Sequence, residues 1–211
     1  MKLYGGLLSP FVMRVVLTAR AKGIELPVEM PDGGIKSDAF LALNPMGKMP
    51  CLVKDEFALP ESSVIIDYLE DTAGGPSIYP ADPQERARVR LLCRMADIYV
   101  VPEVTHLFRG RENPDAVPGA IERLGPVLAN LDCFRKDSDV FAVGDSFTAA
   151  DATLIPIFYF FDVFARPYGT DKLLDAQPRL KAWWERAKAS ELGSQALAEQ
   201  AAGLKAMMAA K

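Results

Sequence analysis

The stretch Asp71-Thr-Ala-Gly-Gly-Pro-Ser-Ile-Tyr-Pro-Ala-Asp-Pro83 divides the chain and decides its fold class. Its two glycines and three prolines predict a linker rather than a helix or a strand. Strand and helix signals alternate before this stretch, whereas the apolar periodicity after it is helical. We therefore expect an α/β domain at residues 1–76, a linker at 77–82 and an all-helical domain at 83–211.

Before the linker, the apolar pattern predicts the order strand, helix, strand, short helix, hairpin, helix. Lys2–Tyr4 is the first expected strand, and Ser9-Pro10 opens a helix that ends before Gly23. The later elements are expected as a strand at 26–30 with an edge proline, a short helix at 37–43, a hairpin of 51–53 with 57–59, and a helix at 61–71.

After the linker, Asp82 is a predicted N-cap and Pro83 the first residue of a long helix. The polar stripe of this helix comprises Arg86, Arg90, Arg94 and Asp97. Its buried stripe comprises Val89, Leu92, Cys93, Ala96 and Tyr99. Further helices are expected at Pro118–Phe134, Ala149–Phe164, Pro178–Ser190 and Ser194–Ala209, the last of them interrupted by Gly203.

Composition excludes several classes of protein. The 211 residues are 50% hydrophobic and 25% charged, and the net charge of −4 comes without a basic block. We therefore expect neither nucleic acid nor a membrane as a partner. The stretch Thr153–Ala165 is too short to span a bilayer, and no signal peptide is recognisable, so a cytoplasmic protein is expected.

Cysteine and histidine content speaks against a metal centre. Cys51, Cys93 and Cys133 form no CxxC pair, and His106 is the only histidine. All three cysteines have apolar neighbours in the sequence, so we expect them to be small core residues in a reducing compartment.

Three short motifs before the linker could bind a ligand. Ser9-Pro10-Phe11 places a hydroxyl at a helix start, Asn44-Pro-Met-Gly-Lys-Met-Pro50 precedes a strand, and Pro60-Glu-Ser-Ser63 precedes a helix. A carboxylate, a hydroxyl and open helix N–H groups suit a ligand end that carries both an ammonium and a carboxylate group. Each motif also has an ordinary structural explanation, since Ser9 and Glu61-Ser62 are suitable helix caps and residues 44–50 suit a simple loop.

The order and spacing of these motifs resemble the cytosolic glutathione S-transferase superfamily, and the resemblance extends along essentially the whole chain. Gly144-Asp-Ser-Phe-Thr-Ala-Ala-Asp151 is similar to the family's N-capping pair, with Thr148 and Asp151 as its members. The resemblance implies a thioredoxin-like first domain followed by an all-helical domain. It also implies a serine-type enzyme similar to the bacterial, omega, tau and zeta classes.

The resemblance assigns roles to particular residues. Ser9 would donate a hydrogen bond to the glutathione sulfur, and Met49, before a cis Pro50, would pair its backbone with the cysteinyl unit. Glu61 and Ser62 would hold the γ-glutamyl end. Lys48 is either a partner of the glycyl carboxylate or a solvated loop lysine.

The wall for the second substrate is harder to identify from the sequence. Leu8, Phe11, Tyr99 and His106 are candidates, although His106 is also explained as a partly exposed helix residue. Many relatives carry arginine where this chain has Ser63, so the missing charge is absent or supplied elsewhere, for example by Arg14. Tyr4 lies too early in the first strand for the catalytic position and is expected to be a strand or core aromatic.

The resemblance therefore predicts a homodimeric glutathione transferase that conjugates glutathione to small hydrophobic electrophiles, without a metal. The loop residue Met46 is expected to contact the partner subunit, and Asp97 to approach the ligand across the interface. Two alternatives remain open at this point: another glutathione-dependent enzyme, such as an isomerase or dehalogenase, and a noncatalytic binding module.

Overall fold

The computed structural model describes residues 1–170 and 172–209, which form two compact units. The first unit consists of Met1–Ile78 together with the segment that begins at Ser194. The second unit is Tyr79–Gly193. No helix among the described residues is long and apolar enough to cross a membrane.

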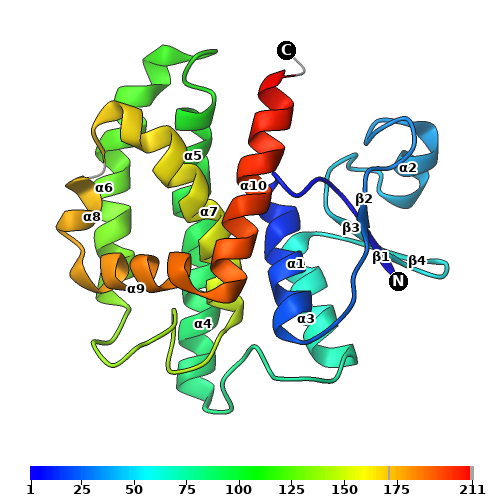
Figure 1. Ribbon diagram of the computed structural model, residues 1–211, viewed down its shortest axis with the longest axis horizontal. Coiled ribbons are helices and arrows are strands. Elements are labelled where there is room, and N and C mark those ends of the chain that lie inside the picture. Colours follow the sequence, from blue (N-terminus) through cyan, green and yellow to red (C-terminus); the bar gives the residue numbers. More distant parts are fainter. Residues whose placement is uncertain (171, 210–211) are drawn as a thin grey trace. The chain divides into compact units, whose positions relative to one another are not determined.

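The first unit contains a four-stranded sheet with the strand order β2-β1-β3-β4 (Figure 1). Strand β1 pairs in parallel with β2 and antiparallel with β3, and β3 forms a hairpin with β4 in which Leu52 faces Leu59. The bounds are β1 Lys2–Tyr4, β2 Val28–Glu29, β3 Cys51–Lys54 and β4 Phe57–Pro60. The expected strands and hairpin are confirmed, although β2 is shorter than its apolar alternation suggests.

Helices α1 (Pro10–Ala21) and α3 (Ser62–Thr72) lie on one side of this sheet, and α2 (Asp38–Leu43) lies on the other (Figure 1). Every residue of α1 from Val12 to Ala19 is buried, because this helix is apolar on most of its surface. Helix α1 ends before Gly23, as the sequence predicts, and the positive φ of 69° at this glycine turns the chain away from the helix axis.

A buried ion pair ties the end of α1 to α3. The Lys22 ammonium, whose side chain is 2% exposed, donates to Glu70 Oε2 at 2.7 Å and to the Pro76 carbonyl at 3.1 Å. Burial acts to raise the pKa of Glu70, but the hydrogen bonds from Lys22, Ser77 and the Ile78 N–H outweigh it and leave the pKa below its ordinary value. The pair fixes the start of the linker against both helices.

The carboxy-terminal helix α10 (Glu191–Ala209) runs alongside α1 (Figure 1). Glu199 accepts two hydrogen bonds from the Arg20 guanidinium, at 2.9 and 2.8 Å. The expected interruption at Gly203 does not occur, and the helix continues through it to Ala209.

The second unit is a set of helices around α7. Its main helices are α4 (Pro83–Met95), α5 (Val101–Phe108), α6 (Val117–Cys133), α7 (Ala149–Ala165), α8 (Lys172–Asp175) and α9 (Pro178–Ala189). A π-helical turn at Ala96–Val100 joins α4 to α5, and short 3₁₀ turns occupy Pro114–Ala116 and Arg166–Tyr168. All residues of α7 from Ala149 to Phe161 are buried, as expected of a helix without a polar face. Asp82 caps α4 as predicted, accepting hydrogen bonds from the N–H groups of Gln84 and Glu85 at 3.0 and 2.9 Å.

The predicted capping pair at the start of α7 is confirmed. Asp151 Oδ2 accepts from the Thr148 N–H at 2.9 Å and from the Thr148 hydroxyl at 2.7 Å. Asp151 Oδ1 accepts from the Ala142 N–H at 2.7 Å and from Trp183 Nε1 at 2.8 Å. Complete burial raises the pKa of Asp151, while the four donors act in the opposite direction. This one carboxylate therefore joins α7, α9 and the loop that precedes α7.

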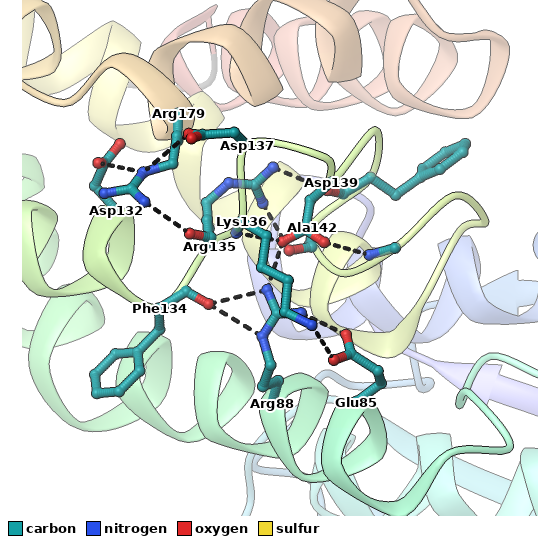
Figure 2. Close-up of polar contacts among 12 residues, drawn as sticks. Glu85, Arg88, Asp132, Phe134, Arg135, Lys136, Asp137, Asp139, Ala142 and Arg179 are labelled. Carbon is teal, nitrogen blue, oxygen red and sulfur yellow. Dashed lines mark hydrogen bonds and ion pairs between the residues drawn. The ribbon is translucent and has the colours of Figure 1, made fainter.

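The loop from Phe134 to Thr148 has no regular secondary structure, yet arginines hold its backbone (Figure 2). Arg88 of α4 and Arg179 and Arg186 of α9 reach it from outside, and Arg135 lies within it. Together they donate to the carbonyl oxygens of Phe134, Arg135, Asp139, Val140, Phe141 and Ala142 at 2.8–3.2 Å. Burial lowers the pKa of Arg135 to about 10, although Asp151 and Asp139 nearby act to raise it.

Two predictions about burial are wrong. Tyr99 was expected on the buried stripe but is 53% exposed, while Val100 beside it is fully buried. The π-helical turn adds a residue to one turn and so rotates the buried face. Of the three cysteines expected in the core, only Cys51 is buried, while Cys93 is half-buried. Cys133 is exposed, because Leu131 and Asp132 take the two inward positions at the end of α6.

Candidate active site

The first unit contains a pocket of about 160 Å³. It is formed by the loop before β3, the end of β4, the start of α3 and one side chain of α1. Its lining residues are Phe11, Asn44, Met46, Lys48, Met49, Pro50, Pro60, Glu61 and Ser62. The structure thus brings together all five residues predicted to bind glutathione: Lys48, Met49, Pro50, Glu61 and Ser62.

The loop of residues 44–50 is shaped by a buried amide that the sequence prediction did not single out. Asn44 is fully buried, donates to the Lys48 carbonyl at 2.6 Å and accepts from the Met46 N–H at 3.1 Å. Gly47 has a φ of 56°, and a β-carbon there would lie 2.8 Å from Lys36 Nζ and 3.1 Å from the Ile35 carbonyl. Only glycine tolerates both the positive φ and the lack of space for a β-carbon. The short distance to Lys36 Nζ also shows that this ammonium lies beside the loop.

Met49 presents its backbone to the pocket. The peptide bond between Met49 and Pro50 is cis. Among the described residues, neither the N–H nor the carbonyl of Met49 bonds to another backbone group. Such a residue, next to the start of β3, can pair with an extended peptide as an additional strand would. Its thioether meanwhile accepts a hydrogen bond from the Gly6 N–H at 3.4 Å.

Glu61 and Ser62 lie at the start of α3. Glu61 has φ 70° and ψ 108°, a left-handed conformation that costs about 1–3 kcal/mol for a residue with a β-carbon. Its carboxylate makes no capping hydrogen bond within the described part of the chain, so simple helix capping does not explain it. The Ile65 N–H donates to the Glu61 carbonyl at 2.9 Å, which leaves the earlier N–H groups of the helix for an anion. Carboxylate and helix N-terminus together suit the ammonium and carboxylate of one amino-acid group.

Ser9 is the N-cap residue of α1, followed by Pro10 at the first helical position. Its hydroxyl makes no capping bond to any described residue, so the simple capping explanation fails here also. The loop that carries Ser9 is fixed by backbone bonds from Gly5 to Glu29 and from Ser9 to Gly6, both at 2.9 Å. Ser9 is half-buried and does not line the pocket itself, whereas Phe11 from the same helix does.

The predicted wall of the second-substrate site is only partly assembled by the first unit. Phe11 lines the pocket, and the buried Arg14 guanidinium lies 5.1 Å from the centre of its ring. Leu8 is half-buried and outside the pocket lining. Tyr99 and His106 belong to the helical unit, where Tyr99 is exposed on the π-helical turn and His106 is half-buried on α5.

Among the described residues, no three histidine, cysteine, aspartate or glutamate side chains gather into a metal-binding group. Tyr4 packs edge-on against Phe40, with ring centres 5.8 Å apart, in agreement with its expected role as a strand aromatic.

Comparison with known proteins decides the family. Residues 3–77 match the glutathione S-transferase N-terminal domain, and residues 114–186 match the glutathione S-transferase C-terminal domain. This chain belongs to the glutathione S-transferase family. It is 33% identical to a probable glutathione S-transferase of Nicotiana tabacum over 86% of this chain and 81% of the relative. It is 32% identical to glutathione S-transferase 3 of Zea mays over 88% of this chain and 87% of the relative.

Solved structures agree with this assignment. A delta-class glutathione transferase of Nilaparvata lugens matches 98% of this chain and 99% of its own, with a TM-score of 0.80 at 26% identity. A bacterial maleyl pyruvate isomerase, described as a zeta-class glutathione S-transferase, matches 93% of this chain and 96% of its own, with a TM-score of 0.74 at 25% identity. The enzyme is therefore a glutathione transferase with glutathione as its co-substrate, and its two units have the glutathione S-transferase fold.

Proposed function

We propose that this transferase is of the serine type and conjugates glutathione to small hydrophobic electrophiles, with Ser9 as the catalytic residue. The observation that carries the proposal is the Ser9 hydroxyl, which occupies an N-cap position without capping its helix. A hydroxyl left without that bond can donate to a sulfur anion, and the adjacent helix N-terminus favours the same negative charge.

We assign each of the three units of glutathione to different residues of the pocket. The γ-glutamyl ammonium pairs with Glu61, and its carboxylate takes the N–H groups at the start of α3 and the Ser62 hydroxyl. The cysteinyl unit pairs with the Met49 backbone. The glycyl carboxylate lies near Lys48, and Lys36, placed by its contact with Gly47, adds a second ammonium.

Ser9 acts by stabilising the thiolate. A free thiol has a pKa near 8.5, so about 3% is ionised at pH 7. A hydrogen bond to a charged acceptor contributes about 1.5–3 kcal/mol, which corresponds to about one to two pKa units. The thiol proton leaves to solvent, the sulfur lone pair forms a bond to the electrophilic carbon, and the leaving group departs with its bonding electrons. Positioning of the electrophile against the sulfur supplies the rest of the acceleration.

The remaining parts of the proposal concern assembly and location. We place the boundary between a glutathione-binding domain at 1–76 and a helical electrophile domain at 83–211, joined by the linker at 77–82.

Met46, which is 44% exposed on the loop before β3, supports a homodimer in which it contacts the partner, with Asp97 near the interface. A cytoplasmic location agrees with the expectation that the cysteines remain reduced. Sedimentation at micromolar concentration tests the dimer, and a monomer would contradict it.

Isomerisation is the second candidate, supported by the likeness to the maleyl pyruvate isomerase. A thiolate can add to a conjugated double bond, allow rotation about the resulting single bond, and leave again with its electron pair. An enzyme of this kind would turn over a maleyl substrate without consuming glutathione, whereas a conjugating enzyme consumes it in equal amount with the electrophile.

Substitution of Ser9 tests the proposal directly. Ser9→Ala is expected to lower conjugation of chlorodinitrobenzene about tenfold to a few hundredfold, with little change in glutathione affinity by calorimetry. Ser9→Cys is expected to lose conjugation as well and to gain a mixed disulfide with glutathione, visible as a mass increment. Full activity in Ser9→Ala, or no mixed disulfide in Ser9→Cys, would contradict the role of Ser9.

A further inference from the structure

Helix α10 approaches the backbone of the loop that carries Ser9. A β-carbon at Gly203 would lie 3.0 Å from Leu8 Cβ, 3.3 Å from the Leu8 nitrogen and 3.4 Å from Leu8 Cα. These atoms belong to the main chain of Leu8 or are attached directly to it, so rotation of a side chain cannot relieve the contact. Glycine is a poor helix former, and its presence in the middle of α10 is explained by this close approach.

A second residue of the same helix binds the same point of the loop. Gln200 is fully buried, and its Nε2 lies 3.4 Å from the Leu8 carbonyl oxygen, to which it donates. Gln200 and Gly203 are three positions apart, so both face the loop from one side of the helix. The bidentate pair between Arg20 and Glu199 fixes α10 against α1, whose N-cap is Ser9.

The opposite side of the loop is fixed by the pocket. The Gly6 N–H donates to Met49 Sδ at 3.4 Å, and the Ser9 N–H donates to the Gly6 carbonyl at 2.9 Å. The segment from Gly6 to Ser9 is therefore held between the pocket loop and α10. Leu8, the residue directly before Ser9, is the point at which α10 touches it.

We propose that α10 positions Ser9 for catalysis, with Gly203 and Gln200 as positioning residues that act through the Leu8 backbone. This inference rests on the proposed role of Ser9 as the donor to the glutathione sulfur. A hydrogen bond weakens steeply with distance and angle, so a shift of a few tenths of an ångström in Leu8 moves the Ser9 hydroxyl away from its best geometry. Glu61, at the start of α3, lies outside this set of contacts.

Gly203→Ala and Gly203→Val test the proposal as a graded pair. Carbon atoms in contact prefer a separation of about 3.5–4.0 Å, so the added β-carbon displaces Leu8. We expect kcat for conjugation to fall about fivefold to a hundredfold in Gly203→Ala and further in Gly203→Val, with a smaller change in KM for glutathione. The Tm of Gly203→Ala should stay close to that of the wild type, because the better helix propensity of alanine offsets the cost of displacing Leu8. The pKa of bound glutathione, followed by ultraviolet thiolate absorbance, should rise in both variants.

A matched control separates positioning from stability. Ala202→Gly lowers the helix propensity at an exposed position of α10 and is expected to lower Tm while leaving kcat and the thiol pKa unchanged. Gln200→Leu removes the donor to the Leu8 carbonyl and is expected to change kcat and the thiol pKa in the same direction as Gly203→Ala. The control therefore changes stability without activity, whereas Gln200→Leu changes activity.

Ser9→Ala, measured beside these variants, distinguishes two kinds of failure. If Ser9→Ala loses activity while Gly203→Ala and Gly203→Val keep the wild-type kcat and thiol pKa, the positioning role of α10 is wrong and the role of Ser9 stands. If the Gly203 variants lose Tm but keep kcat, α10 is only structural. If Ser9→Ala remains fully active, the proposed function fails and the positioning role fails with it.

Discussion

Removal of the Asp151 carboxylate should destabilise the helical unit strongly, because four hydrogen-bond donors converge on it. In Asp151→Ala, the N–H groups of Ala142 and Thr148 and the indole N–H of Trp183 lose their acceptor in a buried site. Each unsatisfied buried donor costs about 1–3 kcal/mol. The Thr148 hydroxyl can turn to another acceptor, and removal of a buried charge returns part of the cost. We therefore expect a loss of about 3–5 kcal/mol, which lowers Tm by about 6–20 °C for a chain of this size.

The two carboxylate oxygens have separate partners, which gives a sharper test. Asp151→Asn can keep the Oδ1 acceptor for Ala142 and Trp183, but its amide NH₂ then faces the Thr148 N–H. We expect a loss of about half that of Asp151→Ala. Thr148→Val removes only the hydroxyl donor and should cost about 1 kcal/mol.

Urea unfolding followed by tryptophan fluorescence is a suitable assay, because both tryptophans lie in α9 and report on the helical unit. Similar m-values across the variants would show that the same structure unfolds in each. A free energy of unfolding of Asp151→Ala within about 1 kcal/mol of the wild-type value would refute the reasoning, since that is the contribution of a single ordinary cap. So would an Asp151→Asn variant less stable than Asp151→Ala.

Three further predictions concern the first unit and the exposed thiol. The pKa of Glu70 is lowered in the fold, so its contribution to the free energy of unfolding is present above its ordinary pKa and is lost as pH falls through the folded value. Glu70→Gln should therefore reduce the loss of stability in acid. An unchanged slope of the free energy of unfolding against pH would argue against the pair with Lys22. In the folded protein Cys133 should react with maleimide first, and Cys51, which is buried and has its pKa raised by burial, should react only after unfolding. An unchanged rate of the fastest labelling step in Cys133→Ser would contradict this. Asn44→Ala should weaken glutathione binding about tenfold by calorimetry through the loss of two loop hydrogen bonds, and wild-type affinity would exclude that positioning role.

The sequence predicts the order of elements in the first unit well, because each strand and helix there has its own stop signal. Gly5, Gly23 and the linker prolines end elements where the structure ends them. The helical unit is harder. The sequence prediction did not use Pro102 and Gly110, which mark the start and the end of α5. The π-helical turn at Ala96–Val100 carries no such signal, and the phase change that exposes Tyr99 depends on packing rather than on propensity.

The candidate site shows the same limit. Motifs close in sequence identify Met49, Glu61 and Ser62, because a turn and a helix start leave local traces. Asn44 belongs to one of the three predicted motifs, but its role as a buried residue that fixes the loop depends on contacts that sequence spacing does not reveal. The contact of Gly203 with Leu8 joins residues almost two hundred positions apart, and the sequence pattern around Gly203 predicts only a weak point in a helix.

The loop between α6 and α7 has a consequence for how sequence and shape can separate. Arg88, Arg179 and Arg186 bind its carbonyl oxygens, and every amino acid carries the same carbonyl. Its path is therefore specified by residues of neighbouring helices, and its outward side chains are left free to diverge over evolutionary time. A fluorophore or a crosslinker can be attached at an exposed position such as Ser138 without a change in the path of the loop. A segment without regular secondary structure can therefore hold a spectroscopic label in a fixed position.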